Sequence, residues 1–222
     1  MKLPLVCAAL FLASTLVTSE ALARPPEGGY FAFGLGYAAA SGDRGVPLKE
    51  APGAGGTEYE EVVRTDFGSG LGFDIRFGWL IGPIAPEISM SGHGTFDFKD
   101  GAGYPSFSVR FHPLLLADSL AAIPFDTSVF IGAGYVIGGY QPKLQVAGFN
   151  ADGKGWDGWD LTFGLGVTYD LSARVRIGLD FRCLLPQYSR FMIDWDDDIN
   201  GHPTETPSTF VFLPTLQIVA SF

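Results

Sequence analysis

The chain has 222 residues, of which 47% are hydrophobic, 14% aromatic and 17% charged, and its formal net charge is -10. Such a hydrophobic content excludes a disordered chain, which is poor in apolar residues. The acidic balance argues against nucleic-acid binding, because an acidic surface offers phosphates no positive footprint. The 30 glycines disfavour helices, and the many aromatic residues favour β-strands.

The first segment has the form of a targeting signal. The basic start Met1-Lys2 is followed by an apolar run, Leu3–Val17, and by the sequence Ala21-Leu22-Ala23. A basic start, a short apolar run and an A-x-A site are typical of a secretory signal peptide. The run is shorter than the about 20 residues that a membrane-spanning helix needs. We expect a signal peptide over residues 1–23 and one mature domain over residues 24–222.

After this segment, apolar residues alternate with small or polar ones. This period of two is the pattern of β-strands, because residues i and i+2 share one face. Between Phe67 and Trp79, one face carries large apolar residues, and the other carries glycines, Asp74 and Arg76. Tilted strands of about 9–11 residues cross a bilayer. The pattern predicts eight strands, at Tyr30–Ala38, Phe67–Trp79, Ile84–His93, Ser106–His112, Asp126–Gly138, Trp159–Leu171, Arg174–Leu184 and Phe210–Phe222.

The two faces of these strands predict a membrane barrel. A soluble barrel would place its large apolar side chains in the core, whereas an outer-membrane barrel turns them toward lipid and keeps a polar interior. The connections also alternate in length, and short periplasmic turns with long outer loops are typical of outer-membrane barrels. The short connections are Gly82-Pro83, Pro113–Pro124 and Leu171-Ser172, and the long ones are Ala40–Asp66, Asp97–Tyr104, Tyr140–Trp156 and Leu185–Pro207.

These features resemble the small outer-membrane β-barrels of Gram-negative bacteria, the OmpA-like and OmpX-like eight-stranded set. The resemblance covers Gly28 to Phe222 and rests on the strand pattern, on Gly34-Leu35-Gly36 and Gly132-Ala133-Gly134, and on the last strand. It implies an all-β fold, a transmembrane eight-stranded antiparallel up-and-down β-barrel in the outer membrane. It also implies contact with outer-membrane lipid and lipopolysaccharide, and a terminal Phe222 that the barrel-assembly machinery reads. We expect a monomer.

The polar face of the strands predicts a filled interior. Eight strands enclose a space just wide enough for side chains to fill. Buried charges must pair there, because an unpaired buried charge costs several kcal/mol. We therefore expect a structural plug, with a narrow gated pore as the alternative. Strand stagger decides which acid meets which arginine. The predicted interior charge network is Asp74, Arg76, Glu87, Arg110, Asp160, Arg174, Arg176, Asp180 and Arg182, and Asp126 and Asp170 share its face.

One long connection contains a candidate metal site. The segment Asp196-Asp197-Asp198-Ile199-Asn200-Gly201 fits the first half of a calcium loop, D-x-D-x-N-G, with oxygen ligands at alternate positions. Asp196, Asp198 and Asn200 would be the ligands. The match then fails, because the twelfth position is Pro207 instead of Glu. A solvated acidic surface is the alternative, and we expect no other cofactor.

The sequence does not predict an enzyme. Some small outer-membrane barrels modify lipid A with His and Ser residues near the outer rim. His93 lies near Ser89 and Ser91 in sequence, but all three are on the inward face and would not reach lipid.

Two functions therefore remain. The first is a structural or interaction role in the cell envelope, with acidic loops shown to partners. The alternative is a small passive channel for small or apolar solutes. A sideways exit would need a break in strand pairing, for which Pro214 and Pro86 are candidates because proline cannot donate to the ladder.

Overall fold

The structure is a computed structural model that describes residues 27–42, 46–47, 62–63, 68–96, 100–116, 123–140, 144–146, 149–151, 154–192, 200–201 and 209–222. Within these ranges, the long strands are β1 (Gly28–Gly42), β4 (Gly70–Leu80), β5 (Ile84–Gly94), β6 (Asp100–Phe111), β7 (Phe125–Tyr140), β10 (Lys154–Asp170), β11 (Val175–Met192) and β13 (Thr209–Ser221). The short elements are β2 (Val46–Pro47), β3 (Val62–Val63), β8 (Leu144–Val146), β9 (Phe149–Ala151), β12 (Asn200–Gly201) and the single-turn helix η1 (Pro113–Leu116). No helix in the described part of the chain is long and apolar enough to cross a membrane.

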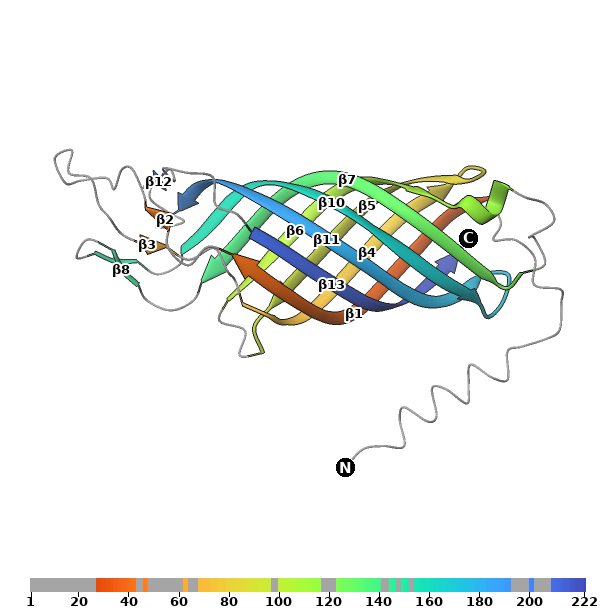
Figure 1. Ribbon diagram of the computed structural model, residues 1–222, viewed down its shortest axis with the longest axis horizontal. Helices are drawn as coiled ribbons and strands as arrows, with labels where there is room; N and C mark the ends of the chain where they lie inside the picture. The colour runs from red at the N-terminus through yellow and green to blue at the C-terminus, as the bar shows by residue number, and fades with distance from the viewer. Residues whose placement is uncertain are drawn as a thin grey trace, which may run out of the picture.

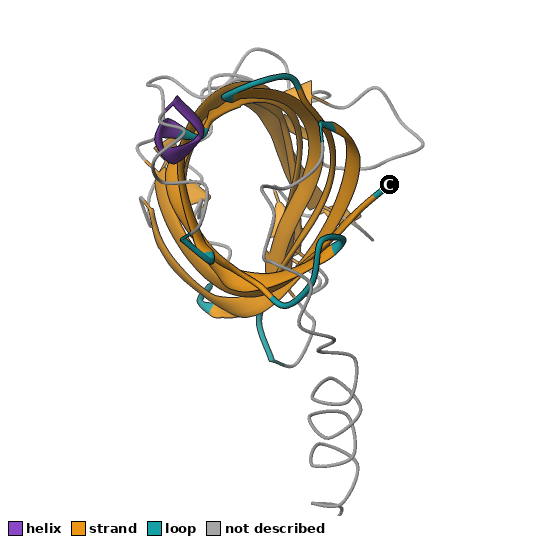
Figure 2. Ribbon diagram, turned by 90° about the vertical axis from the view of Figure 1, so that its right-hand side faces the viewer, coloured by secondary structure: helices purple, strands orange, loops and turns teal. Residues whose placement is uncertain are grey.

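The eight long strands form one closed antiparallel sheet. Each strand pairs with its neighbours in the order β1-β4-β5-β6-β7-β10-β11-β13, and β13 pairs with β1 to close the ring. Figure 1 shows the tilted strands from the side, and Figure 2 shows the ring from one end. Closure leaves no unpaired edge, and each unpaired backbone group would cost several kcal/mol in lipid. The predicted eight-stranded up-and-down barrel is confirmed.

The two ends of the barrel differ in their connections. At one end, which we call the short-turn end, Ile81 and Ile84 exchange backbone hydrogen bonds of 2.8 and 3.2 Å around a tight turn. Gly82 in this turn has a φ of +56°, a left-handed conformation that glycine adopts without strain. The terminal Phe222 also lies at this end, where its backbone N–H donates to the carbonyl of Gly29 at 2.9 Å. The opposite end, on the left of Figure 1, is the long-loop end.

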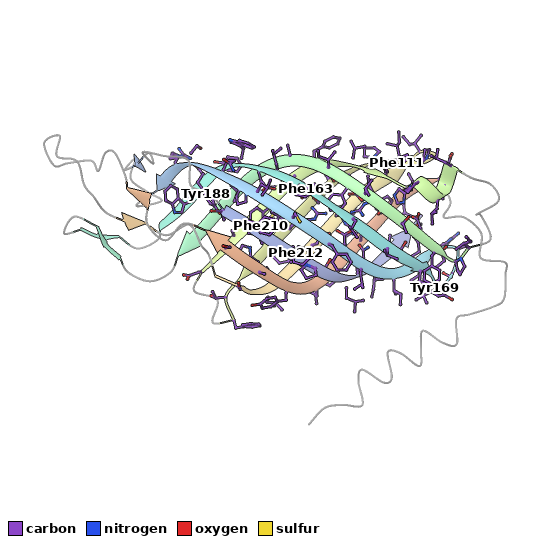
Figure 3. The ribbon with its side chains drawn as sticks, in the orientation of Figure 1. Phe111, Phe163, Tyr169, Tyr188, Phe210 and Phe212 are labelled. Carbon is purple, nitrogen blue, oxygen red and sulfur yellow. The ribbon has the colours of Figure 1, made fainter. Side chains whose placement is uncertain are left out.

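The outer surface is apolar, as the alternation of the sequence predicts. On β10, the inward residues Asp160 and Thr162 are fully buried. Figure 3 shows side chains standing out along the barrel wall, with Phe163 and Tyr169 labelled. The outward residues of β10 are between 38% and 50% exposed, and they are Trp159, Leu161, Phe163, Leu165, Val167 and Tyr169. This run covers roughly 33 Å along the strand and, at a tilt of about 40°, roughly 25 Å along the barrel axis, which is the height of an outer-membrane apolar band.

Several strands run further toward the long-loop end than predicted, and three show the largest extensions. The strand β6 begins at Asp100 instead of Ser106, β10 begins at Lys154 instead of Trp159, and β11 ends at Met192 instead of Leu184. The predicted ends lie where the apolar alternation stops. Backbone pairing does not need an apolar face once a strand has left the lipid, so the ladders continue beyond that point.

A polar cluster on the outer surface marks this limit. The hydroxyl of Tyr135 donates to Asp157 Oδ2 at 2.6 Å, and Arg190 Nε donates to the same oxygen at 3.0 Å. A β-bulge between Asp157 and Gly158 shifts the register so that Arg190 lies opposite Asp157. Charged side chains on the lipid-facing surface are costly at the bilayer midplane and tolerated near its interface. This rim cluster of Tyr135, Asp157 and Arg190 therefore lies at the upper edge of the apolar band.

Candidate functional site in the barrel interior

The inward faces of four strands bring six charged side chains together. We call this group the central charge cluster, and all its members are buried. Glycines provide the necessary space: the Tyr30 ring lies against Gly78, and the Phe130 ring lies against Gly164, so that a larger residue at either glycine would collide with the ring. The members are Asp74 and Arg76 on β4, Glu87 on β5, Arg110 on β6, and Asp180 and Arg182 on β11.

The central charge cluster is a connected set of ion pairs. Arg110 Nε lies 2.8 Å from Glu87 Oε1, and Arg110 Nη1 lies 2.9 Å from Asp180 Oδ1. Arg76 Nη1 lies 3.2 Å from the same Asp180 oxygen, and Arg76 Nε lies 2.9 Å from Asp74 Oδ2. The third arginine, Arg182, places Nη2 3.3 Å from Asp74 Oδ1. Arg76 Nη1 also lies 3.9 Å from Glu87 Oε1, so each carboxylate serves at least two arginines, and three acids balance three bases.

Neutral side chains form further hydrogen bonds with the charged groups of this cluster. The Tyr30 hydroxyl donates to Glu87, and Ser91 Oγ donates to Asp74 at 2.7 Å. The guanidinium of Arg110 packs 4.3 Å from the centre of the Phe130 ring. The remaining neutral partners are Ser89, Ser108, Ser128 and Gln217. Buried networks of this kind rigidify a core, since loss of one partner leaves a polar group unpaired at low dielectric.

A second polar group lies toward the short-turn end. His112 Nδ1 lies 2.6 Å from Asp126 Oδ2, and Arg176 Nη1 lies 3.8 Å from the same oxygen. Asp170 is the cross-strand partner of Arg176. His112 has no place in the predicted network, although its alternation with Arg110 puts it on the inward face. The signal was present in the spacing, but a single histidine does not show which acid it meets.

The long-loop half of the interior is aromatic and apolar. The rings of His93 and Tyr104 stack with centroids 5.8 Å apart, and those of Trp156 and Tyr188 lie 5.7 Å apart. Asp160 is fully buried in this half, but it makes no ion pair with the arginines of the central charge cluster among the described residues. The apolar side chains buried here are Val136, Leu184, Val211 and Leu213.

Arg174 is placed differently from the prediction. It is exposed in the turn at residues 171–174, and β11 begins only at Val175. Its backbone N–H donates to Ser172 Oγ at 3.3 Å. Because the chain reverses direction there, the alternation that turns Arg176 inward does not extend to Arg174. The prediction that Arg174 belongs to the interior network is wrong.

A small cavity lies at the level of the arginines. It has a volume of about 20 Å³ and is bounded by Arg76, Glu87, Arg110 and Arg176, among others. Such a volume holds about one water molecule. The charged side chains around the cavity therefore lie close together, as expected for the narrow interior of an eight-stranded barrel.

Two other predictions, the calcium loop and the terminal Phe222, are not tested by the structure. Asp196 and Asp198 of the calcium loop lie outside the described residues, and Asn200 lies in β12, where it pairs with Met192. Within the described residues, no group of three or more His, Cys, Asp or Glu side chains could hold a metal ion. Calcium binding stays a prediction. Phe222 is 74% exposed, and its role as an assembly signal also stays a prediction.

The comparisons with known proteins agree on the fold. No family model matches the chain, and no curated protein matches it. The crystal structure of Neisserial surface protein A matches with a TM-score of 0.54 and 12% identity, covering 88% of this chain and 98% of that one. The outer membrane protein OprG from Pseudomonas aeruginosa matches with a TM-score of 0.52 and 12% identity, covering 91% and 99%. The chain therefore has the fold of the small eight-stranded outer-membrane β-barrels.

Proposed function

We propose that the protein is an integral outer-membrane β-barrel of a Gram-negative bacterium whose interior is plugged and whose role in the envelope is structural or interactive. It is not an enzyme in this proposal. The observation that carries the proposal is the central charge cluster, in which each carboxylate contacts at least two arginines. Ion-paired side chains that cross the interior leave no wide path for solutes. We therefore assign the function to the outer surface and the loops.

The outer surface supports the location. An apolar band of roughly 25 Å ends at the rim cluster, where Asp157 and Arg190 form an ion pair. Aromatic residues such as Tyr135 and Trp159 lie at the same level, as in the interfacial belts of membrane proteins. A soluble protein rarely exposes such a continuous apolar surface. Lipid and lipopolysaccharide are the partners that fit this surface.

The long connections supply the surface for an interaction role. The segment Ala40–Asp66 contains six acids and three bases, and Leu185–Pro207 contains five acids and one base. Negative charge of this density repels other anionic surfaces and favours basic partners.

Epitope tags test the location and the topology together. Tags inserted near Gly55 and Gly153 should label on intact cells, and a tag between Leu116 and Ser119 should label only after permeabilisation. The tag between Leu116 and Ser119 is the control for cell integrity. Labelling of the Leu116–Ser119 tag on intact cells, with protection of the other two, would contradict the proposal.

A second candidate function, sideways passage of small apolar solutes, is favoured by interruptions in strand pairing. The β1–β13 ladder pairs Gly36 with Thr215 and resumes only at Ala39 with Phe212, so it skips the position of Pro214. The β4–β5 ladder ends at Gly78 and Glu87, directly before Pro86. Proline lacks the N–H that these ladders need, so the wall is weakest there.

A reversible cross-link tests this second candidate. In a Cys183→Ala background, Tyr37→Cys combined with Pro214→Cys would place two thiols across the interrupted ladder. If solutes pass there, oxidation should stop the uptake of an apolar aromatic solute by intact cells, and a reductant should restore it. Uptake that equals that of cells lacking the protein, whether oxidised or reduced, would rule the candidate out.

A further inference from the structure

The small cavity beside the central charge cluster has an unusually positive wall. It is bounded by three guanidinium groups, those of Arg76, Arg110 and Arg176, and by one carboxylate, that of Glu87. The acids that pair with these arginines, Asp74, Asp126 and Asp180, contact them from other sides and do not line the cavity. The carboxylate of Glu87 is already engaged by Arg110, Tyr30 and Ser108.

Two donors of this wall have no partner in the described part of the chain. They are Arg110 Nη2 and Arg176 Nε, and both side chains are about 95% buried. A buried donor that makes no hydrogen bond is destabilising, and more so when it belongs to a charged group. His112, which also lines the cavity, has an unpartnered Nε2. The cavity is therefore a place where buried polar groups still lack an acceptor.

Arg176 has longer polar contacts than the other two arginines of the cavity wall. Its distance to Asp126 Oδ2 is 3.8 Å, and that oxygen already has a 2.6 Å contact with His112. Its hydrogen bond to Ser221 Oγ is long, at 3.4 Å. Asp170 lies opposite Arg176 in the β10–β11 register. By contrast, Arg76 and Arg110 each have carboxylate contacts of 3.2 Å or less.

We propose that this cavity binds a small inorganic anion of the halide class, chloride under ordinary conditions, between Arg110 Nη2 and Arg176 Nε. The cavity volume of about 20 Å³ suits a single-atom ion and is too small for an organic anion. The anion accepts hydrogen bonds from these two donors, which have no partner within the described residues. It enters from the short-turn end, because Arg176 is the second residue of β11 and His112 directly follows β6.

If chloride binds in the cavity, the stability of the folded protein should depend on which anion is present. This effect does not depend on any role of the loops. A ligand that binds only the folded state stabilises it in proportion to the logarithm of its concentration. At chloride concentrations about 100-fold above the dissociation constant, the melting temperature should rise by roughly 5–10 °C. The experiment compares purified protein in detergent with sodium chloride, sodium bromide or sodium gluconate at equal ionic strength. Gluconate is too large for the cavity.

Two variants separate the cavity from general salt effects. Arg176→Gln removes one anchoring donor, and Arg174→Gln removes the same charge from the exposed turn two residues away. The halide-specific shift should disappear in Arg176→Gln and remain in Arg174→Gln. If Arg176→Gln fails to fold, bromide soaked into crystals of the unchanged protein decides the question through its anomalous scattering. A bromide peak between Arg110 and Arg176 is expected. Equal melting in halide and gluconate, with water alone in the cavity, would overturn the proposal.

Discussion

The two halves of the barrel interior are filled by different chemistry. The short-turn half is held by ion pairs, in which Asp180 Oδ1 lies within 3.2 Å of both Arg76 and Arg110. The long-loop half is filled by stacked rings, including Trp156 and Tyr188, and by aliphatic side chains such as Leu184. Both are buried, but the first half depends on every charge keeping its partner, whereas the second depends on volume. If the interior is plugged as proposed, the charged half should be the barrier, and the aromatic half should contribute mainly packing.

The largest effect should follow from removing the shared acid. Asp180→Ala leaves Arg76 and Arg110 short of a counter-charge, and breaking a buried pair costs about 3–5 kcal/mol. Water admitted to the site should also raise the single-channel conductance above that of the unchanged protein. The measurements are urea unfolding in detergent micelles and recording in planar bilayers. Arg174→Ala is the matched control, because an exposed turn residue should change stability by less than about 0.5 kcal/mol. Equal stability of the two variants would contradict the comparison.

Trp156→Ala should destabilise the protein without opening it. Truncating a fully buried aromatic residue costs about 3–5 kcal/mol, at the lower end where neighbours can collapse. The central charge cluster lies closer to the short-turn end and stays intact, so conductance should remain at its unchanged level. The same two measurements apply. Conductance that rises as much as in Asp180→Ala would show that the aromatic half is the barrier.

Substitutions that keep the side-chain volume should distinguish the contribution of charge pairing in the short-turn half from that of packing in the long-loop half. Leu184→Met keeps the volume of a core residue and should cost less than about 1.5 kcal/mol. Asp180→Asn also keeps the volume but removes a charge shared by several arginines, so its cost should be clearly larger. The comparison uses the urea midpoints of both variants. A reversed order would mean that the packing of Leu184 in the long-loop half contributes more to stability than the charge of Asp180 in the short-turn half.

The smallest effect is expected outside the interior. Arg190→Gln breaks the rim pair with Asp157, in which the arginine side chain is 42% exposed. Partly exposed pairs contribute about 0.2–1 kcal/mol and weaken with salt. Unfolding at low and high ionic strength measures this, and the loss should shrink at high salt. A loss as large as that of Asp180→Ala would make the rim pair part of the structural core.

The sequence predicted the strands and their faces because period-two alternation follows directly from the geometry of the strand. Asp74, Arg76 and Glu87 lie inward, as their spacing predicts. The ion-pair partners could not be predicted, since they depend on the stagger of strands far apart in sequence, such as β4 and β11. Several strand ends were predicted too early, because backbone pairing continues past the lipid band to Lys154 and Met192. Arg174 was misplaced for a different reason: β11 begins only at Val175, so the inward alternation does not reach the turn.

The uncharged hydrogen-bond partners of the central charge cluster were also not predicted from the sequence. Tyr30 and Gln217 are hydrogen-bonded to Glu87 and Arg76, yet a tyrosine at the start of a strand is usually an interfacial residue. Their inward position follows from alternation, but their role appears only once the charged side chains have been located.

Ion conductance of the purified, unchanged protein in planar bilayers tests the central claim most directly. If the central charge cluster plugs the barrel, the recordings should stay at the baseline of the bare bilayer, apart from rare brief openings. A control protein refolded in the same way, Asp180→Ala, should conduct. A steady conductance of the unchanged protein, equal to that of Asp180→Ala, would mean that the interior is a water-filled pore and would contradict the plug.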